Sequence, residues 1–139
     1  MEVDNMSGEQ NLRALLASMQ PRLEEGEFVF CTMSAERAGR LSIHPVGLFR
    51  ESEGITVILD KHEADNEGLK YYLVSRMITL DVHSSLEAVG FLAVIMRKLA
   101  EEGISVNPVS GYFHDHLFVP KDKARNTMRV LEDIMHNSA

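Results

Sequence analysis

The sequence predicts an α+β protein built from two similar units. Segments rich in β-branched and aromatic residues alternate with stretches whose apolar residues recur at helical spacing, and serine or aspartate precedes several of those stretches. The chain has 139 residues, of which 45% are hydrophobic and 25% are charged, as in ordinary globular domains. A chain of this length buries enough surface to form a core without disulfide bonds or structural metal ions.

The first predicted element is a short helix that docks on the rest of the protein. Ser7 and Gln10 have capping-box spacing ahead of it, and Pro21 ends it. Its apolar residues fall at positions i, i+3, i+4 and i+7, so they form one stripe, which consists of Leu12, Leu15, Leu16 and Met19.

The first half of the chain then predicts three strands and a helix. A turn at residues 50–54 joins the second and third strands, because Gly54 tolerates a positive φ. Asp60 and Glu63 have capping-box spacing at the start of a short helix, which Gly68 ends. Residues 39–41 show no periodicity and are predicted to form a loop. The three strands are expected at residues 27–33, 46–49 and 55–59.

The second half predicts a strand, a helix, two strands and a last helix. Ser84 and Glu87 have capping-box spacing at the start of a helix over residues 86–102, whose first half is apolar almost all round. Its apolar residues form one stripe of Leu86, Val89, Ala93, Met96 and Ala100 and a neighbouring stripe of Leu92, Ile95 and Leu99. We therefore expect this helix to be covered on more than one side. The last helix carries a core stripe of Ala124, Met128, Leu131 and Met135. The strands are expected at residues 76–83, 104–109 and 116–119.

This order of elements corresponds to the split βαβ plan of ferredoxin-like βαββαβ folds, with antiparallel sheets and helices on one face. A short internal echo supports a repeat. Residues 59–64 and 119–124, which are 60 positions apart, each end a strand and open a helix, with Lys and Ala in register. The sequence therefore predicts a first unit, with the docking helix, over residues 1–75 and a second unit over residues 76–139.

Composition and charge exclude several classes of function. The net charge of −7 disfavours binding to nucleic acids and to anionic membranes, because phosphate groups repel an acidic protein. The single cysteine excludes an intrachain disulfide framework. The first residues lack the pattern of a signal peptide, and no apolar run reaches the about 20 residues of a membrane span, so a cytoplasmic protein is expected. The common enzyme and nucleotide-binding motifs are absent, so we expect no catalysis and no cofactor.

Three segments carry residues with chemical potential. His114 and His116 have the i, i+2 spacing that places two side chains on one face of a strand, so they are candidate metal ligands, although the same residues suit a polar hairpin turn. Cys31 lies in an apolar strand and is expected to pack in the core. Residues 83–87 form a strand-to-helix turn, where the free N–H groups of a helix start suit a carboxylate.

Residues 81–124 resemble the ACT-domain family, and the string GYFHDHLFVP at residues 111–120 is the most specific part of the resemblance. The strings LEEGEFVFC (residues 23–31) and FRESEG (residues 49–54) are similar to a branch of that family with two tandem units. The resemblance implies a regulatory ligand-binding protein, whose ligand is most often an amino acid, and a homodimer. It also implies a ligand site at the turn after the first strand and at the start of the second, which here are His83, Ser84, Ser85, Leu86, Ile104, Ser105, Val106 and Asn107.

Three functions remain open from the sequence. The first is a non-catalytic module that binds an amino acid or a similar carboxylate. The second is an assembly module that dimerises without a ligand. The third is a small metal-dependent enzyme that uses His114 and His116.

Overall fold

The computed structural model describes residues 8–82 and 88–139. The chain divides into two compact units. One consists of residues 25–76, and the other consists of the described parts of residues 1–24 and 77–139. Each unit has a sheet and its own apolar core, which confirms the predicted α+β class with tandem units. The predicted division of the chain between residues 75 and 76 stays a prediction.

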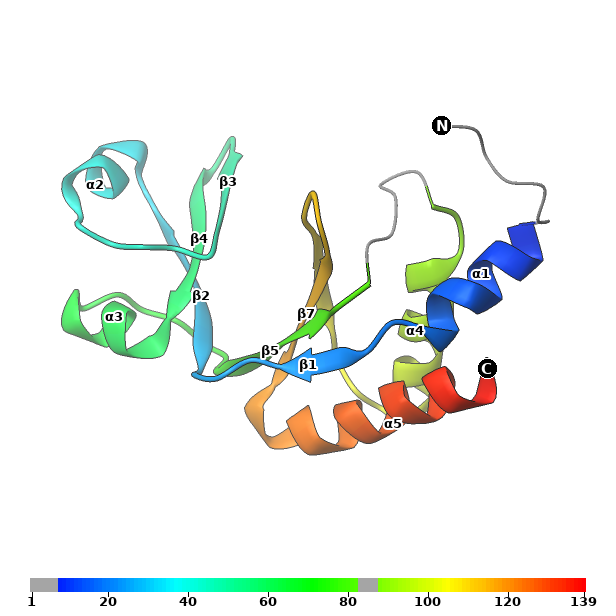
Figure 1. Cartoon of the computed structure of the whole chain (residues 1–139). Helices are drawn as coiled ribbons and strands as arrows, with labels where there is room; N and C mark the ends of the chain where they lie inside the picture. Colours follow the sequence, from blue (N-terminus) through cyan, green and yellow to red (C-terminus); the bar gives the residue numbers. More distant parts are fainter. Residues whose placement is uncertain (1–7, 83–87) are drawn as a thin grey trace. The chain divides into compact units, whose positions relative to one another are not determined.

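The unit of residues 25–76 contains a split βαβ arrangement. Strand β4 (Gly54–Asp60) lies between β2 (Phe28–Met33) and β3 (Gly47–Glu51) and is antiparallel to both (Figure 1). Phe28 of β2 also pairs with Ser75, the first residue of β5 (Ser75–Leu80). This sheet order is the one that the ferredoxin-like plan requires.

Two short helices cover one face of this sheet. Alternate residues of the strands form a core with Ala64 of α3 (Lys61–Asn66), and Ala38 of α2 (Ala35–Arg40) packs against it. The predicted cap of α3 is confirmed, because the side chain of Asp60 accepts a hydrogen bond from the backbone N–H of His62 at 2.8 Å. The predicted loop at residues 39–41 is wrong, because Gly39 and Arg40 end α2.

The sequence does not predict helix α2, because the helix is short and buries no residue. Its stability comes from its first turn, where the hydroxyl of Ser34 accepts a hydrogen bond from the backbone N–H of Arg37 at 3.1 Å.

The other unit has the same strand arrangement but takes one strand from the N-terminal segment. Its sheet has the order β1-β5-β7-β6, with β1 at Pro21–Leu23, β6 at Asn107–Ser110 and β7 at Asp115–Pro120. Strand β1 pairs antiparallel with β5 from Pro21↔Leu80 to Leu23↔Ile78. Strand β1 therefore occupies the position of the last strand of a βαββαβ unit, although it precedes the rest of the unit in the sequence.

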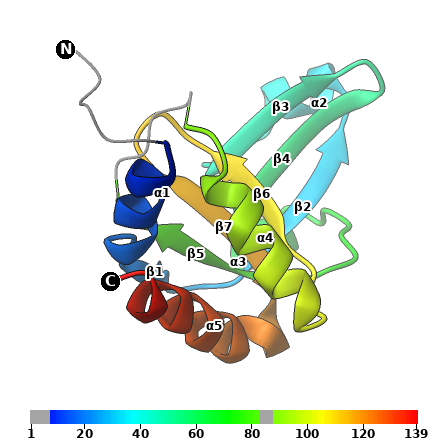
Figure 2. The same cartoon turned by 90° about the vertical axis from the view of Figure 1, so that its right-hand side faces the viewer.

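Three helices pack on one face of this second sheet. They are α1 (Gly8–Ala17), α4 (Phe91–Glu101) and α5 (Ala124–Asn137), which follows the short η1 (Lys121–Lys123) (Figure 2). Helix α1 contacts both α4 and α5, and Leu16 and Met19 are buried in the same core. The predicted stripe of α5 is confirmed, since Ala124 and Leu131 are buried and both methionines pack against the core.

Of the two predicted stripes of α4, the one with Leu92, Ile95 and Leu99 is confirmed, because Ile95 and Leu99 are buried with Phe91 and Leu92 packs against the core. The other stripe is wrong in part, because Ala93 and Ala100 are exposed. The N-cap of α4 is Gly90 at a φ of 93°, so Val89 precedes the helix and is 88% exposed. The helix is therefore shorter than the apolar run, and its inward face follows the spacing i, i+4, i+8 from Phe91. The first part of the predicted helix, Leu86 included, falls outside the described residues.

Candidate functional site

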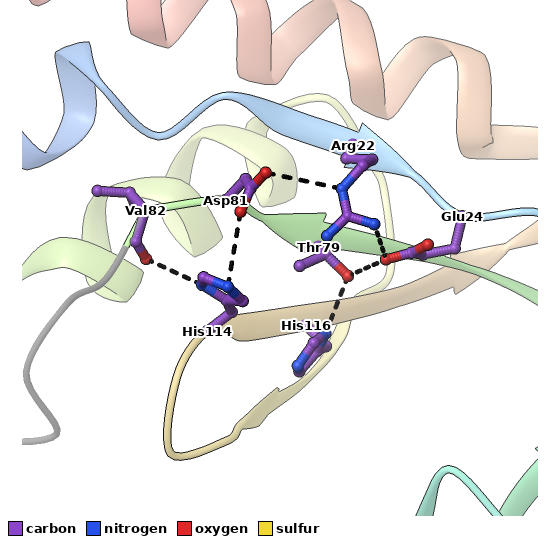
Figure 3. Close-up of polar contacts among 7 residues, drawn as sticks. All are labelled: Arg22, Glu24, Thr79, Asp81, Val82, His114 and His116. Atoms are coloured by element: carbon purple, nitrogen blue, oxygen red, sulfur yellow. Dashed lines mark hydrogen bonds and ion pairs between the residues drawn. The ribbon is translucent and has the colours of Figure 1, made fainter.

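A network of polar side chains lies on the helix-free face of the second sheet (Figure 3). Ile78 and Leu80 of β5 point into the helix-covered core. Because side chains alternate along a strand, Thr79 between them points to the opposite face. The same alternation in β1 turns Arg22 and Glu24 away from Leu23, which packs on the core. The network therefore joins segments that are more than 50 residues apart in the sequence.

Thr79 is the centre of this network. Its side chain is only 1% exposed, and its hydroxyl donates a hydrogen bond to Glu24 Oε2 at 2.7 Å. The hydroxyl oxygen of Thr79 also lies 3.0 Å from Nδ1 of His116. Since a hydroxyl has one proton and that proton goes to the carboxylate, His116 must donate from Nδ1. The neutral ring of His116 therefore carries its proton on Nδ1 and keeps Nε2 as an acceptor.

Burial acts on His116 more strongly than the neighbouring charges do. The pKa of His116 is lowered, first by desolvation and then by repulsion from His114, while Glu24 and Asp115 oppose the shift. The ring is therefore neutral at pH 7. Asp115, the next residue back along the chain, is buried and accepts a hydrogen bond from the hydroxyl of Ser110 at 2.6 Å. This contact ties the two strands of the β6–β7 hairpin together.

A more exposed group of charges lies beside Thr79, at the end of β5. Arg22 donates from Nη1 to Glu24 Oε2 at 2.7 Å, and its Nε lies 3.8 Å from Asp81 Oδ2. Asp81 Oδ1 is also 3.5 Å from His114 Nε2. The side chains of Arg22 and Asp81 are 51% and 44% exposed. A guanidinium and a carboxylate are therefore both accessible to a small molecule at this end of the sheet.

Half of the predicted ligand residues fall outside the described part of the chain. These are His83, Ser84, Ser85 and Leu86. The network extends to Val82, the last described residue before them, because His114 Nδ1 is 3.5 Å from the carbonyl oxygen of Val82. The other four predicted residues lie around the start of β6, where Ile104 is buried in the core, Val106 is half-buried, and Ser105 and Asn107 are exposed.

His114 and His116 contact other polar groups of the protein and form no metal site with the described residues. His116 is bonded to Thr79, and His114 faces Asp81 and Val82. Within residues 8–82 and 88–139, no group of three or more His, Cys, Asp or Glu side chains could hold a metal ion. Cys31 is buried in the core of the first unit as predicted, and burial raises the pKa of its thiol.

Arg22, Glu24 and Thr79 were not singled out from the sequence. They come together only because β1 pairs with β5, and a three-residue strand leaves no periodic signal. The charges of Arg22 and Glu24 on either side of the apolar Leu23 were the one local indication of a half-buried strand.

The chain belongs to the ACT-domain family. Two ACT-domain matches cover residues 7–76 and residues 73–133. The two matches fall in tandem, in agreement with the two sheets of split βαβ topology. No curated protein matches the chain. Of the described residues, none form a helix that is long and apolar enough to cross a membrane.

Solved structures extend the comparison. A protein of unknown function from Vibrio cholerae, described as a possible transport protein, has 44% sequence identity and a TM-score of 0.83, over 93% of this chain and 99% of its own. The regulatory subunit of aspartate kinase from Thermus thermophilus has 8% identity and a TM-score of 0.58, over 82% and 96% of the two chains. The aspartate kinase of Clostridium acetobutylicum, described as allosteric, has 5% identity and a TM-score of 0.64, over 83% and 33%. The last two show a shared fold.

Proposed function

We propose that this ACT-domain protein is a non-catalytic regulatory module that binds an amino acid. The observation that carries the proposal is the pair Arg22 and Asp81, which offers opposite charges on one half-exposed surface. An amino acid has a carboxylate and an ammonium group, so it needs a cation and an anion close together. The 3.8 Å separation between Arg22 Nε and Asp81 Oδ2 is long for an ion pair, which leaves both groups capacity for a ligand.

Four of the predicted ligand residues follow Asp81 closely in the sequence. Asp81 and Val82 lead into His83, Ser84, Ser85 and Leu86, which we propose as the part of the site that receives the carboxylate. The aspartate kinase regulatory subunit that shares this fold gives the proposal further support, because its description assigns it a regulatory role.

The test is a thermal-shift screen of the standard amino acids, followed by calorimetry for any amino acid that raises the melting temperature. Arg22→Gln and Asp81→Asn should each abolish the shift while the variants stay folded, because both side chains are half-exposed. Arg125→Gln and Asp122→Asn change exposed residues of α5 and η1 and serve as matched controls. A ligand at 100 times its Kd adds about 2.7 kcal/mol to the free energy of unfolding, so a true ligand is readily detected. The proposal fails if no amino acid shifts the melting temperature.

A second candidate function, homodimerisation without a ligand, is favoured by strand β3. Among the described residues, β3 pairs only with β4, so its other edge is open. Val46, Leu48 and Phe49 at this strand are 52%, 54% and 70% exposed. An open edge with exposed apolar side chains is prone to pair with another chain.

Light scattering of the wild type and of Phe49→Lys tests the second candidate. If the protein dimerises through β3, the variant should be monomeric, because a lysine on the edge opposes strand pairing. A dimer that persists in the variant would contradict an interface at β3. Dimerisation lost in Phe49→Lys, together with an absence of amino-acid binding, would favour assembly over sensing.

A further inference from the structure

The unit of residues 25–76 has a cleft that the proposed amino-acid site does not use. The cleft lies along β2, between α2 and the loop that follows α3, and its volume is about 1050 Å³. That volume is at the upper end of the range for small-molecule sites. It exceeds what a single amino acid would fill.

Two tyrosine side chains border the cleft. Tyr71 and Tyr72 line it from the loop after α3. Phe30 of β2 also borders it, but its ring points to the opposite face of the sheet, because side chains alternate along a strand and Cys31 faces the core. Tyr72 is fully exposed, so its ring is available to stack on a ligand. Planar rings are recognised by such side chains through stacking and edge contacts.

The loop that carries the tyrosines is fixed by polar contacts. The hydroxyl of Tyr71 donates a hydrogen bond to Asp65 Oδ1 at 2.6 Å, and Lys61 Nζ donates to Asp65 Oδ2 at 2.9 Å. These two donors lower the pKa of Asp65, the contact with Tyr71 contributing most. The one carboxylate in the cleft lining is thus ionised, and each of its oxygens already accepts a hydrogen bond.

The cleft also contains two cations. Arg37 of α2 and Lys70 of the loop line it, and neither forms an ion pair within the part of the chain that the structure describes. Because Asp65 is engaged with Lys61, the cleft offers a ligand two cations but no unpaired carboxylate. The protein carries a net charge of −7, so this local excess of positive charge differs from the whole molecule.

We infer that this cleft binds a planar aromatic molecule that carries a negative charge. The rings of Tyr71 and Tyr72 contact the planar part, and Arg37 and Lys70 receive the anionic group. The anionic group is a phosphate or a carboxylate, so nucleoside monophosphates and aromatic carboxylates share the required chemistry.

The experiment titrates the full-length protein with adenosine monophosphate and with salicylate, as probes of the two kinds of anion, by calorimetry. Arg37→Gln and Tyr72→Ala remove one charge and one ring, and both side chains are exposed, so the fold should persist. Arg40→Gln, on the same helix but outside the cleft lining, is the matched charge control, and Tyr112→Ala is the aromatic control.

Cys31 provides an independent readout, because it lines the cleft and is the single cysteine of the chain. A bound probe should slow the alkylation of Cys31 by iodoacetamide in the wild type. The same protection should appear in Arg40→Gln at the same probe concentration and should need about tenfold more probe in Tyr72→Ala.

Saturable binding of at least one probe is expected, with an about tenfold weaker affinity in Arg37→Gln and in Tyr72→Ala and an unchanged affinity in the two controls. Binding of adenosine monophosphate alone would identify the anion as phosphate, and binding of salicylate alone would identify it as carboxylate. The inference is overturned if neither probe binds saturably at concentrations up to about 10 mM, which would nearly saturate a site with a Kd of about 1 mM. It is equally overturned if the controls weaken binding as much as the cleft variants.

Discussion

Replacing Thr79 by valine should break the polar network without changing its shape. Valine has nearly the same volume as threonine but lacks the hydroxyl. That hydroxyl makes both central contacts, at 2.7 Å to Glu24 and at 3.0 Å to His116. In Thr79→Val, the Nδ1–H of His116 loses its acceptor and Glu24 loses a donor. Because the site of the hydroxyl is only 1% exposed, water does not replace it readily.

The expected loss in the free energy of unfolding follows from the two hydrogen bonds of Thr79. A hydrogen bond to a charged group contributes about 1.5–3 kcal/mol and a neutral one about 1 kcal/mol. Burial of the additional methyl group of valine stabilises the folded state by about 1 kcal/mol, and Arg22 continues to donate to Glu24. The expected net loss in the free energy of unfolding is therefore about 2 kcal/mol. Thr79→Ser, which keeps the hydroxyl and loses a methyl group, should cost about 1 kcal/mol.

Urea denaturation measures this loss, and ¹⁵N NMR of the imidazole rings identifies the tautomer. The wild type and Thr79→Ser should carry the neutral proton of His116 on Nδ1, whereas Thr79→Val should transfer it to Nε2. The reasoning is refuted if Thr79→Val unfolds within about 0.5 kcal/mol of the wild type. It is also refuted if His116 keeps its Nδ1 proton in that variant.

Three further predictions concern other residues. Because the pKa of His116 is lowered in the folded state, the unfolded state binds more protons as the pH falls below about 6.5, so the free energy of unfolding should decrease from pH 7.5 to 5.5. Urea titrations should show a shallower decrease in His116→Gln. Asp60→Ala should lower the free energy of unfolding by about 1 kcal/mol in the same assay, because α3 loses its N-cap, whereas Asp60→Asn should be nearly neutral. Native Cys31 should react slowly with iodoacetamide and rapidly in urea, since burial raises the pKa of its thiol; equal rates, followed by mass spectrometry, would contradict this.

Local patterns made much of the fold predictable. The α3 cap at Asp60 and the inward stripe of α5 depend on residues that are close in the sequence. Helix α2 has no apolar periodicity, and β1 has three residues, so neither gave a detectable pattern. In α4 the apolar run begins before the helix start at Gly90. The composition alone therefore did not show which of the two apolar stripes of the helix faces the core.

The site was harder to predict than the fold. His114 and His116 were conspicuous in the sequence, but their partners Asp81 and Thr79 are more than 30 residues away. Which residues meet depends on the order β1-β5-β7-β6, and in particular on the strand that the N-terminal segment supplies. Chain order does not determine that pairing, so Arg22 and Glu24 could be recognised only in three dimensions.

The position of β1 has a consequence for synthesis on the ribosome. Residues 25–76 form one compact unit from a continuous stretch of chain, so that unit can fold as soon as it has emerged. The other unit needs residues from both sides of it. Helix α1 and strand β1 are synthesised before residues 25–76, but their apolar faces are covered only after β5 and α5 have been made. Helix α1 and strand β1 therefore reach their final place only after residues up to α5 have been made.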